Sequence, residues 1–579
     1  MPAPRIDVDT FLAIDLGSIH TRVSLFDVVN GEYRYIATGS APSTIDAPYN
    51  DVEESVHRAI LHLQEVSGRL IINNESQIVV PTNANGVGAD RMVMSFSGGP
   101  EIRVVVAGLL QDVSLGSALR LAQTAPVKIV DTIGIHDKRK PDALLDSIIK
   151  NKTDLIILSG GTDNGATRSV LKLVEIILLV CKVLPQSSRP KLIYLGNAFL
   201  AGKIKEILKK WTNTATAPNV RPSLDVENIT PNLDVLGNVL TFLRSQAIGG
   251  FENLARGCST QPAPTSHATG KMVQFLSQIN DPAKNVLAVD MGGNSTTLAL
   301  ANKGNLSLHV MANGMGKNIQ RLAEPAFLEQ MHQVTPFPFV SAMARDYLWQ
   351  KSLYPDSVPM TEETYAVEQA AIRVILKMAA REALAVTRQE FLVAEPVLAS
   401  GAPVCKMPYP GSSLLALLDG LQPAGVSTFI LDSNNILASL GVIARVNAIL
   451  PVQVLESNAF LNLGTIIAPV SRCHAGTHIL TVTVEEETGQ QTQTDILQGS
   501  LIILPVKMGQ AVKVTLEAFN GALIDPLFDR RTLNFKILGG FCGIVVDARG
   551  RPLVLPKDPE RRAGLYGHWF QALGITKGR

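Results

Sequence analysis

The stretch VLAVDMGGNSTTLAL, residues 286–300, decides the fold, because an apolar strand ends in an acid and a glycine turn that leads directly into a second strand. The same order occurs near the start of the chain, where TFLAIDLGS (residues 10–18) precedes HTRVSLFDVV (residues 20–29). Alternating apolar and polar residues predict antiparallel strands around each turn. Two copies about one domain length apart predict a duplicated, two-lobed α/β protein.

Each turn combines residue types that suit a phosphate and a metal ion. Glycine lets backbone N–H groups approach phosphate oxygens without a Cβ atom in the way, and small hydroxyls add donors. Asp15 and Asp290 end the two apolar strands, and a carboxylate there could hold Mg²⁺ through water. Two such hairpins facing each other would clamp the phosphates of a nucleotide. The glycine turn in LASGA, residues 398–402, is the expected resting place for adenosine.

Between the two copies, four short apolar runs are each followed by a polar turn and a helical pattern: IRVVVAGL, VKIVDTIG, DLIILSGG and KLIYLGN. This alternation predicts βα units around a parallel sheet, and hence an inserted α/β subdomain. The third run ends in SGGTDNGA, residues 159–166. Such a turn can bind an anion at a helix N-terminus, or Asp163 or Asn164 can simply cap the next helix. The residues leave both interpretations open.

Two further segments have distinct patterns. STQPAPTSHAT, residues 259–269, is rich in Pro, Ser and Thr and predicts a flexible loop or interdomain hinge. Beyond Pro451 the short strands and glycine turns predict a small all-β domain with a final helix. The expected domains are 1–100 with 211–258 (first lobe), 101–210 (insert), 271–450 (second lobe) and 451–579 (C-terminal β-rich domain).

Composition narrows the class of protein. The 579 residues include 52 Lys and Arg against 51 Asp and Glu, so the net charge of +1 removes the usual argument for a nucleic-acid or anionic-membrane partner. Five scattered cysteines without a CxxC pair argue against a disulfide framework and favour a reduced compartment. The most apolar window, residues 170–184, is too short to span a bilayer. We therefore predict a soluble, cytoplasmic protein.

Several stretches resemble the actin-like ATPase superfamily and, within it, the glutamate-mutase-associated MutL family. The likeness follows the family's order over about residues 11–445, and SGGTDNGA is its most specific motif. The other matching stretches include YLGNAFLAGKIKEIL (residues 194–208), ENITPNLDVLGNV (227–239), VLAVDMGGNSTTLAL (286–300) and ILASLGVIA (436–444). The resemblance implies an ATP-dependent chaperone or reactivating factor for adenosylcobalamin-dependent mutases, with ATP and Mg²⁺ as ligands.

The resemblance also implies roles for individual residues. Asp290 would organise Mg²⁺ and the attacking water, and Asp15 would share the metal. The implied nucleotide contacts are Gly17, Ser18, Thr21, Gly292, Gly293, Asn294, Ser295, Thr296 and Gly401, with Gly160, Gly161, Thr162 and Asp163 of the insert. Two positions depart from the family pattern, because Thr297 stands where a second Asp is usual and Arg22 where Lys is usual.

Three functions stay open at this point. The first is the mutase chaperone, whose partner is another protein. The second is a nucleotide-locked scaffold or a self-assembling actin-like protein, which the loss of a carboxylate at Thr297 favours. The third is a small-molecule kinase on the same fold, with Asp163 as a candidate base. The residues leave open whether ATP is hydrolysed or only bound, and which oligomer forms.

Overall fold

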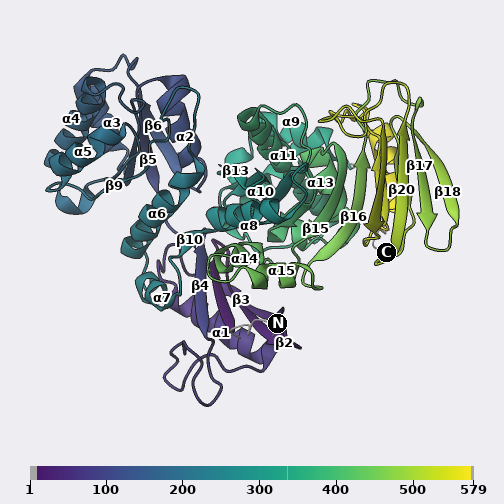
Figure 1. The fold of residues 1–579 in the computed structure, drawn as a ribbon, viewed down its shortest axis with the longest axis horizontal. Coiled ribbons are helices and arrows are strands. Elements are labelled where there is room, and N and C mark those ends of the chain that lie inside the picture. The colour runs from purple at the N-terminus through teal and green to yellow at the C-terminus, as the bar shows by residue number, and fades with distance from the viewer. Residues whose placement is uncertain (1–8, 336, 576–579) are drawn as a thin grey trace, which may run out of the picture.

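The chain forms two lobes, an inserted subdomain and a C-terminal sheet (Figure 1), in a computed structural model that describes residues 9–335 and 337–575. The first lobe contains a five-stranded sheet of order β10-β4-β1-β2-β3. Its strands are β1 (Phe11–Leu16), β2 (His20–Val29), β3 (Glu32–Pro42), β4 (Arg91–Phe96) and β10 (Ala263–Pro264). The central strand β1 pairs antiparallel with β2 and parallel with β4. Helix α1 (Glu53–Ser67) packs against β3 through its apolar face.

The second lobe repeats this arrangement within a larger sheet of order β13-β12-β11-β14-β15-β16-β22-β19. Its first five strands are β11 (Val286–Met291), β12 (Thr296–Asn302), β13 (Asn305–Met311), β14 (Val397–Ser400) and β15 (Gly425–Leu431). As in the first lobe, the first strand pairs antiparallel with the second and parallel with the fourth. The shared strand order confirms the predicted two-lobed, actin-like fold.

The C-terminal region is divided between two sheets, and this differs from the single β-rich domain expected after residue 450. Strands β16 (Leu461–Ala468), β19 (Leu501–Leu504) and β22 (Ile544–Asp547) extend the sheet of the second lobe. The other strands form a separate sheet of order β18-β17-β20-β21: β17 (His478–Glu486), β18 (Gln491–Leu497), β20 (Ala511–Ala518) and β21 (Thr532–Leu538). Strand β22 joins the sheet of the second lobe because all of its residues are apolar enough to be buried or have partners there. Every residue of β22 is buried, as a strand inside a covered sheet requires.

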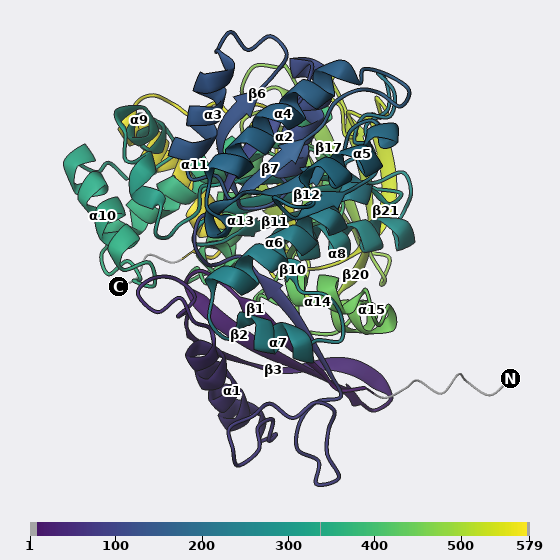
Figure 2. The ribbon, with the colours of Figure 1, turned by 90° about the vertical axis from the view of Figure 1, so that its left-hand side faces the viewer.

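The inserted subdomain has an all-parallel sheet of order β6-β5-β7-β8-β9 with helices on its faces. Its strands are β5 (Arg103–Ala107), β6 (Lys128–Ile133), β7 (Leu155–Leu158), β8 (Lys191–Tyr194) and β9 (Thr214–Thr216). Its helices are α2 (Gly116–Ala122), α3 (Pro141–Lys150), α4 (Arg168–Val183) and α5 (Ala201–Leu208). In the side view the first-lobe strands and α1 lie below it (Figure 2). The predicted α/β insert is thus confirmed.

The remaining helices cover the two lobes. They are α6 (Leu233–Ala247), α7 (Phe251–Gly257), α8 (Thr265–Ile279), α9 (Pro325–Gln333), α10 (Ser341–Leu353), α11 (Glu362–Thr387), α12 (Ala402–Cys405), α13 (Pro410–Leu421), α14 (Leu437–Ile443), α15 (Ile449–Leu455) and α16 (Pro559–Ala572). Helix α11 begins at a capping box, in which Thr361 and Thr364 exchange side-chain and backbone hydrogen bonds. In the described part of the chain, no helix is both long and apolar enough to cross a membrane.

Two helices cross at the junction of the lobes. A Cβ atom on Gly441 of α14 would lie 1.9 Å from the carbonyl oxygen of Ala268 on α8, so the helices touch backbone to backbone. Helix α14 also contacts β1 and β4, and α15 packs against β3. Helices α14 and α15 follow the strands β11 to β15 of the second lobe in sequence, but they pack on the first lobe.

Within the expected loop at residues 259–269, residues 263–269 instead form a short strand and the first turn of α8. Residues 262–270 are buried, so the segment is part of the core. Its polar side chains have partners inside the protein: the Thr265 hydroxyl donates to Asp15 at 3.2 Å, and the Ser266 hydroxyl donates to the carbonyl of Thr124 at 2.8 Å. Polar composition here serves internal hydrogen bonds and not solvation, which is why the loop prediction was wrong.

His267 makes the stability of this junction depend on pH. Burial lowers its pKa to about 4, and its Nε2 atom lies 3.1 Å from the Thr124 hydroxyl. Because the folded pKa lies below that of an exposed histidine, the unfolded chain binds the proton more tightly, and stability is lost as pH falls from about 6.5 towards 4. We expect the free energy of unfolding to fall by about 2–3 kcal/mol from this group between pH 7 and pH 4.5.

Urea unfolding at the two pH values measures this loss. The His267→Gln variant has no imidazole to protonate. Between pH 7 and pH 4.5, its free energy of unfolding should therefore fall by about 2–3 kcal/mol less than that of the wild type. The matched control is His568→Gln, because His568 is exposed. An equal pH dependence in the wild type and in the His267→Gln variant would contradict the assignment.

Candidate functional site

The two predicted glycine turns have the same geometry at corresponding places in the two lobes. In the first, the N–H of Gly17 donates to the carbonyl of His20 at 3.1 Å; in the second, the N–H of Gly292 donates to the carbonyl of Ser295 at 2.9 Å. The cross-strand register also repeats, with the pairs Asp15–Arg22 and Asp290–Thr297. Each central strand therefore delivers its aspartate to the same point, just before the turn.

The turns face each other across a cavity of about 440 Å³ between the lobes. A Cβ atom on Gly293 would lie 2.4 Å from Cδ1 of Ile19 and 3.0 Å from Oγ of Ser18, so glycine is what lets the turns approach this closely. The predicted site residues that line the cavity are Asp15, Gly17, Ser18, Asp290, Gly292, Gly293 and Gly401. We call this cavity the interlobe cleft.

Asp15 is held in place by two hydroxyl groups. The side chains of Ser95, at the end of β4, and Thr265, at the start of α8, donate to its Oδ1 atom at 2.8 Å and 3.2 Å. Its Oδ2 atom lies 3.8 Å from Nη1 of Arg22 on the neighbouring strand. One oxygen of Asp15 is thus committed to the fold, and the other remains available near the cleft.

The pKa of Asp290 is strongly shifted by its surroundings in the cleft. Burial is the main cause that raises its pKa to about 7, and the nearby charges of Asp15 and Asp432 raise it further, whereas Arg22 lowers it. A carboxyl group with this pKa exchanges a proton readily near neutral pH, as a general acid or base must.

Gly401 joins a third strand end to the second turn. Its φ is +95°, and a Cβ atom there would lie 2.0 Å from the carbonyl oxygen of Met291, so another residue would be both strained and obstructed. Its N–H donates to the side-chain oxygen of Asn435 at 3.2 Å, and Asn435 also lines the cleft. The glycine turn predicted to support adenosine therefore lies in contact with the second hairpin turn.

The loop between α10 and α11, residues 354–360, covers part of the cleft and is called the cover loop here. Residues 355–359 line the cavity. Nε2 of His20, in the first hairpin, lies 3.2 Å from Oδ1 of Asp356, so a side chain of the first lobe contacts this loop of the second lobe. Burial is the main cause that lowers the pKa of His20.

Comparison with known families decides what kind of protein has this cleft. The sequence profile of a family described as MutL protein matches residues 11–459. The chain belongs to the MutL family. The match spans both lobes and the insert, and it ends before the C-terminal strands β16 to β22. No sequence among curated proteins matches the chain.

Solved structures similar to this MutL-family chain include three proteins of low sequence identity. Nucleotide-free acetone carboxylase is 12% identical with a TM-score of 0.33, over 85% of this chain and 81% of that one. Ethanolamine utilization protein EutJ from Carboxydothermus hydrogenoformans is 9% identical with a TM-score of 0.26, over 76% and 90%. Nucleotide-free diol dehydratase-reactivating factor is 11% identical with a TM-score of 0.29, over 76% and 99%. At such scores the fold assignment rests on the strand order described above.

Four predicted contacts of the hairpins do not line the cleft. The hydroxyl of Thr21 donates to Oγ of Ser55 on α1 at 3.0 Å, and the hydroxyl of Thr296 donates to the carbonyl of Asn313 at 2.8 Å. Both threonines are completely buried. Asn294 and Ser295 complete the second turn outside the residues that line the cavity. In this MutL-family chain, the predicted hairpin contacts that line the cleft are therefore the three glycines, Gly17, Gly292 and Gly293, and Ser18.

The SGGTDNGA motif also lies outside the cleft, because it ends strand β7 in the insert. Gly160, Gly161, Thr162 and Asp163 are therefore not brought together with the two turns. Oδ1 of Asp163 accepts hydrogen bonds from the side-chain amide of Asn219 at 2.9 Å and from the N–H of Ala198 at 3.2 Å. It thus ties neighbouring loops of the insert together and does not cap α4, which begins at Arg168.

Asp432 is a buried carboxylate near Asp290 that the sequence analysis missed. It follows strand β15 and is completely buried. It accepts hydrogen bonds from the N–H groups of Ile436 and Leu437 at 3.0 and 2.9 Å, and from the Ser400 hydroxyl at 2.8 Å. Burial raises its pKa in spite of these bonds. The signal was present, since FILD at 429–432 ends an apolar strand in an acid, as AIDL and AVDM do.

The donor set of the cleft fits Mg²⁺. Asp15 and Asp290 line the same cavity, and the charge of Asp15 helps to raise the pKa of Asp290, so a cation between them would relieve repulsion. Among the described residues, no group of three or more His, Cys, Asp or Glu side chains is arranged to hold a metal. Two carboxylates nevertheless suit Mg²⁺, which takes its other ligands from water and substrate phosphates.

Proposed function

We propose that this MutL-family protein binds Mg·ATP in the interlobe cleft, hydrolyses it slowly, and acts as a chaperone or reactivating factor for an adenosylcobalamin-dependent mutase. The observation that carries the ATPase part is the position of Asp290. Its carboxyl group lies at the end of β11 between two opposed glycine turns, and its pKa is about 7. A group of that pKa can take a proton from an attacking water at neutral pH.

The other residues of the cleft bind and orient the nucleotide. The N–H groups around Gly17 and Gly293, with the Ser18 hydroxyl, are donors for phosphate oxygens on opposite sides of the cavity. Gly401 offers a flat backbone surface to the adenosine. Bound Mg²⁺, held through its water ligands by Asp15 and Asp290, would neutralise charge on the phosphates. The reaction would depend chiefly on positioning and charge neutralisation, as phosphoryl transfer does generally.

The chaperone part rests on membership of the MutL family, and the cleft supports it through its connection to both lobes. The first hairpin contacts the cover loop through His20 and Asp356, and Gly293 packs against Ile19 across the lobe boundary. Loss of the γ-phosphate from this boundary would change how the lobes close. Such movement is the means by which hydrolysis would act on a bound mutase.

Calorimetric titration of Mg·ATP, followed by measurement of ADP release, tests the proposal. The Gly401→Ala variant should bind Mg·ATP at least about tenfold more weakly, because its Cβ atom would displace the second turn. Gly202→Ala is the matched control, since a Cβ atom at Gly202 on α5 meets nothing within 4 Å. Absence of binding to the wild type would overturn the proposal.

A nucleotide-locked scaffold is the second candidate, and Thr297 favours it. This residue pairs with Asp290 across the second hairpin, where the family pattern has a carboxylate. With one acid fewer at the metal, the cleft would hold ATP without turnover. Tight binding without ADP release, together with ATP-dependent light scattering or sedimentation of larger species, would favour this function over the ATPase.

A further inference from the structure

A second cavity, of about 1210 Å³, lies between the C-terminal strands and the second lobe. Its wall is formed by loops at 470–475, 498–499, 520–526 and 549–556 and by helix α16. None of the described residues that line it also lines the interlobe cleft. We call it the C-terminal cavity, and nothing in the nucleotide chemistry above uses it.

The charged side chains on this wall are mostly cationic. The wall contains the arginines Arg472, Arg549, Arg551 and Arg561, and Glu390 is the one acid among the described residues there. The side chains of Arg549 and Arg551 are only 2% exposed. Arg472 and Arg561 are exposed, and neither forms an ion pair within the described part of the chain. The cavity thus has two buried arginines, held by ion pairs, on its inner wall and two exposed arginines at its rim that pair with no acid in the described ranges.

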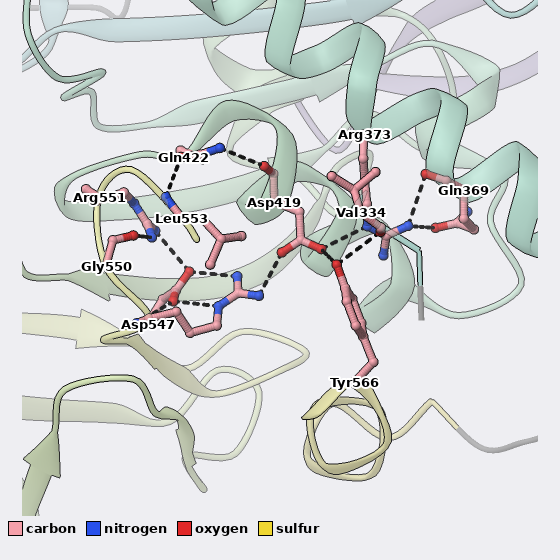
Figure 3. A network of polar contacts seen from close by, with 11 residues as sticks. Val334, Gln369, Arg373, Asp419, Gln422, Asp547, Gly550, Arg551, Leu553 and Tyr566 are labelled. Carbon is pink, nitrogen blue, oxygen red and sulfur yellow. Dashed lines mark hydrogen bonds and ion pairs between the residues drawn. The ribbon is translucent and has the colours of Figure 1, made fainter. Parts of the chain in front are cut away.

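Two buried aspartates neutralise part of this charge (Figure 3). Arg549 donates to Asp547 at 2.8 and 2.9 Å and to Asp419 at 2.7 Å. Arg551 donates to Asp547 at 2.9 Å, and Arg373 donates to Asp419 at 2.8 Å. Three guanidinium groups therefore share two carboxylates, and one positive charge is left over. A buried charge in excess is costly unless an anion compensates it.

The two buried arginines, Arg549 and Arg551, also have N–H groups that no acceptor in the described part of the chain uses. A guanidinium group has five N–H bonds. Arg549 directs three towards Asp547 and Asp419, and Arg551 directs three towards Asp547 and the carbonyls of Pro423 and Gly550. Two N–H groups of each therefore have no protein acceptor among the described residues, and both side chains line the cavity. They can serve the oxygens of one ligand.

The rest of the wall suits an organic molecule. Trp569 on α16 lies under the guanidinium of Arg549, whose Cζ atom is 4.5 Å from the ring centroid. Leu553, Leu555 and Leu565 add apolar surface. The side-chain oxygen of Gln498 on the same wall is buried without a hydrogen-bond partner in the described part of the chain. An apolar wall with a few polar groups is the usual make-up of a small-molecule site.

We propose that the C-terminal cavity binds a small organic anion, whose carboxylate or phosphate group contacts the arginines and whose apolar part packs beside Trp569. Arg549 and Arg551 supply fixed, partly neutralised donors, and Arg472 and Arg561 close over the anion from the rim. Charge-assisted bonds from arginine to carboxylate and phosphate have the same geometry, so the wall accepts either group.

Titration of the full chain with phenyl phosphate, phenylacetate and inorganic phosphate, without nucleotide, tests the proposal. Binding should change the fluorescence of Trp569, and the Trp569→Phe variant should lose that signal. Removing the rim cations in Arg472→Ala/Arg561→Ala should weaken binding at least about tenfold. Both residues are exposed, so the variant keeps the buried network intact. The matched control, Arg530→Ala/Arg531→Ala, removes the same charge outside the cavity.

Each result bears on the proposal. Binding of phenyl phosphate or phenylacetate that only the rim variant loses supports it and identifies the preferred head group. Equal loss in both double variants would reduce the effect to general charge attraction and overturn it. Displacement of the probe by Mg·ATP would place the probe in the interlobe cleft, which also overturns it. Absence of binding by all three probes to the wild type has the same consequence.

Discussion

The Asp290→Asn substitution is expected to lower ATP turnover about 10²–10⁴-fold, the range by which a general base accelerates a reaction, while the affinity for Mg·ATP falls by a smaller factor because Asp15 still holds the metal. Asparagine has nearly the same shape as aspartate but cannot take up a proton. In the wild type this carboxyl group has a pKa of about 7, because it is buried and lies near Asp15 and Asp432. Single-turnover ADP formation, with binding measured separately by calorimetry, resolves the two quantities.

Asp356→Asn provides the matched control, because it removes a carboxylate from the rim of the same cleft. Asp356 contacts His20 and is largely exposed, so turnover should stay within about threefold of the wild type. Equal turnover in the wild type and in Asp290→Asn would remove Asp290 from the chemistry. A loss of binding that accounts for the whole loss of turnover would assign Asp290 to nucleotide affinity alone.

The Asp419→Ala substitution is expected to have the largest effect on stability, about 3–5 kcal/mol lower free energy of unfolding. Asp419 is completely enclosed and accepts hydrogen bonds from Arg373, Arg549 and the hydroxyl of Tyr566, at 2.8, 2.7 and 2.7 Å. Its removal takes one acceptor away from each of two buried cations and from a buried phenol. The donors come from α11, the end of β22 and α16, so the loss would loosen the attachment of the C-terminal region (Figure 3).

Urea unfolding followed by circular dichroism measures this effect. The Asp225→Ala variant is the control, since Asp225 is exposed and should change stability by less than about 0.5 kcal/mol. Asp419→Asn keeps the side-chain shape and one acceptor oxygen but loses the charge, and it should lie between the wild type and Asp419→Ala. Similar stability of Asp419→Ala and Asp225→Ala would mean that the arginines find other acceptors.

The two hairpins could be predicted because their signal is local. A strand that ends in an acid and a glycine turn needs only about ten consecutive residues, and it occurs twice. Thr21 and Thr296 do not line the cleft, because side chains alternate between the faces of a sheet. Thr21 lies opposite Leu16, and Thr296 opposite Met291, so each faces away from the aspartate one residue earlier. Applying that alternation would have excluded both threonines.

Other features could not be predicted because they depend on contacts between distant segments. Residues 262–269 are buried at the lobe junction, where Thr265 meets Asp15 across 250 positions of sequence. Strands β16, β19 and β22 look like their neighbours in sequence, and only pairing decides that they join the second lobe. The burial of an arginine also depends on distant contacts: Arg562 is buried and donates to the carbonyl of Thr335 at 2.9 Å.

The crossing of the lobes by α14 and α15 determines when the first lobe can form during synthesis. Its core contains Phe11 and Leu12 of β1 together with Leu440 and Ile443 of α14. At about 5–20 residues per second, the ribosome takes roughly 20–90 s to make the intervening chain. During that time the apolar face of the first strands is not yet covered by α14. One core cluster of the insert, between residues 105 and 208, is local in sequence, so we expect this part of the chain to fold before the first strands are covered.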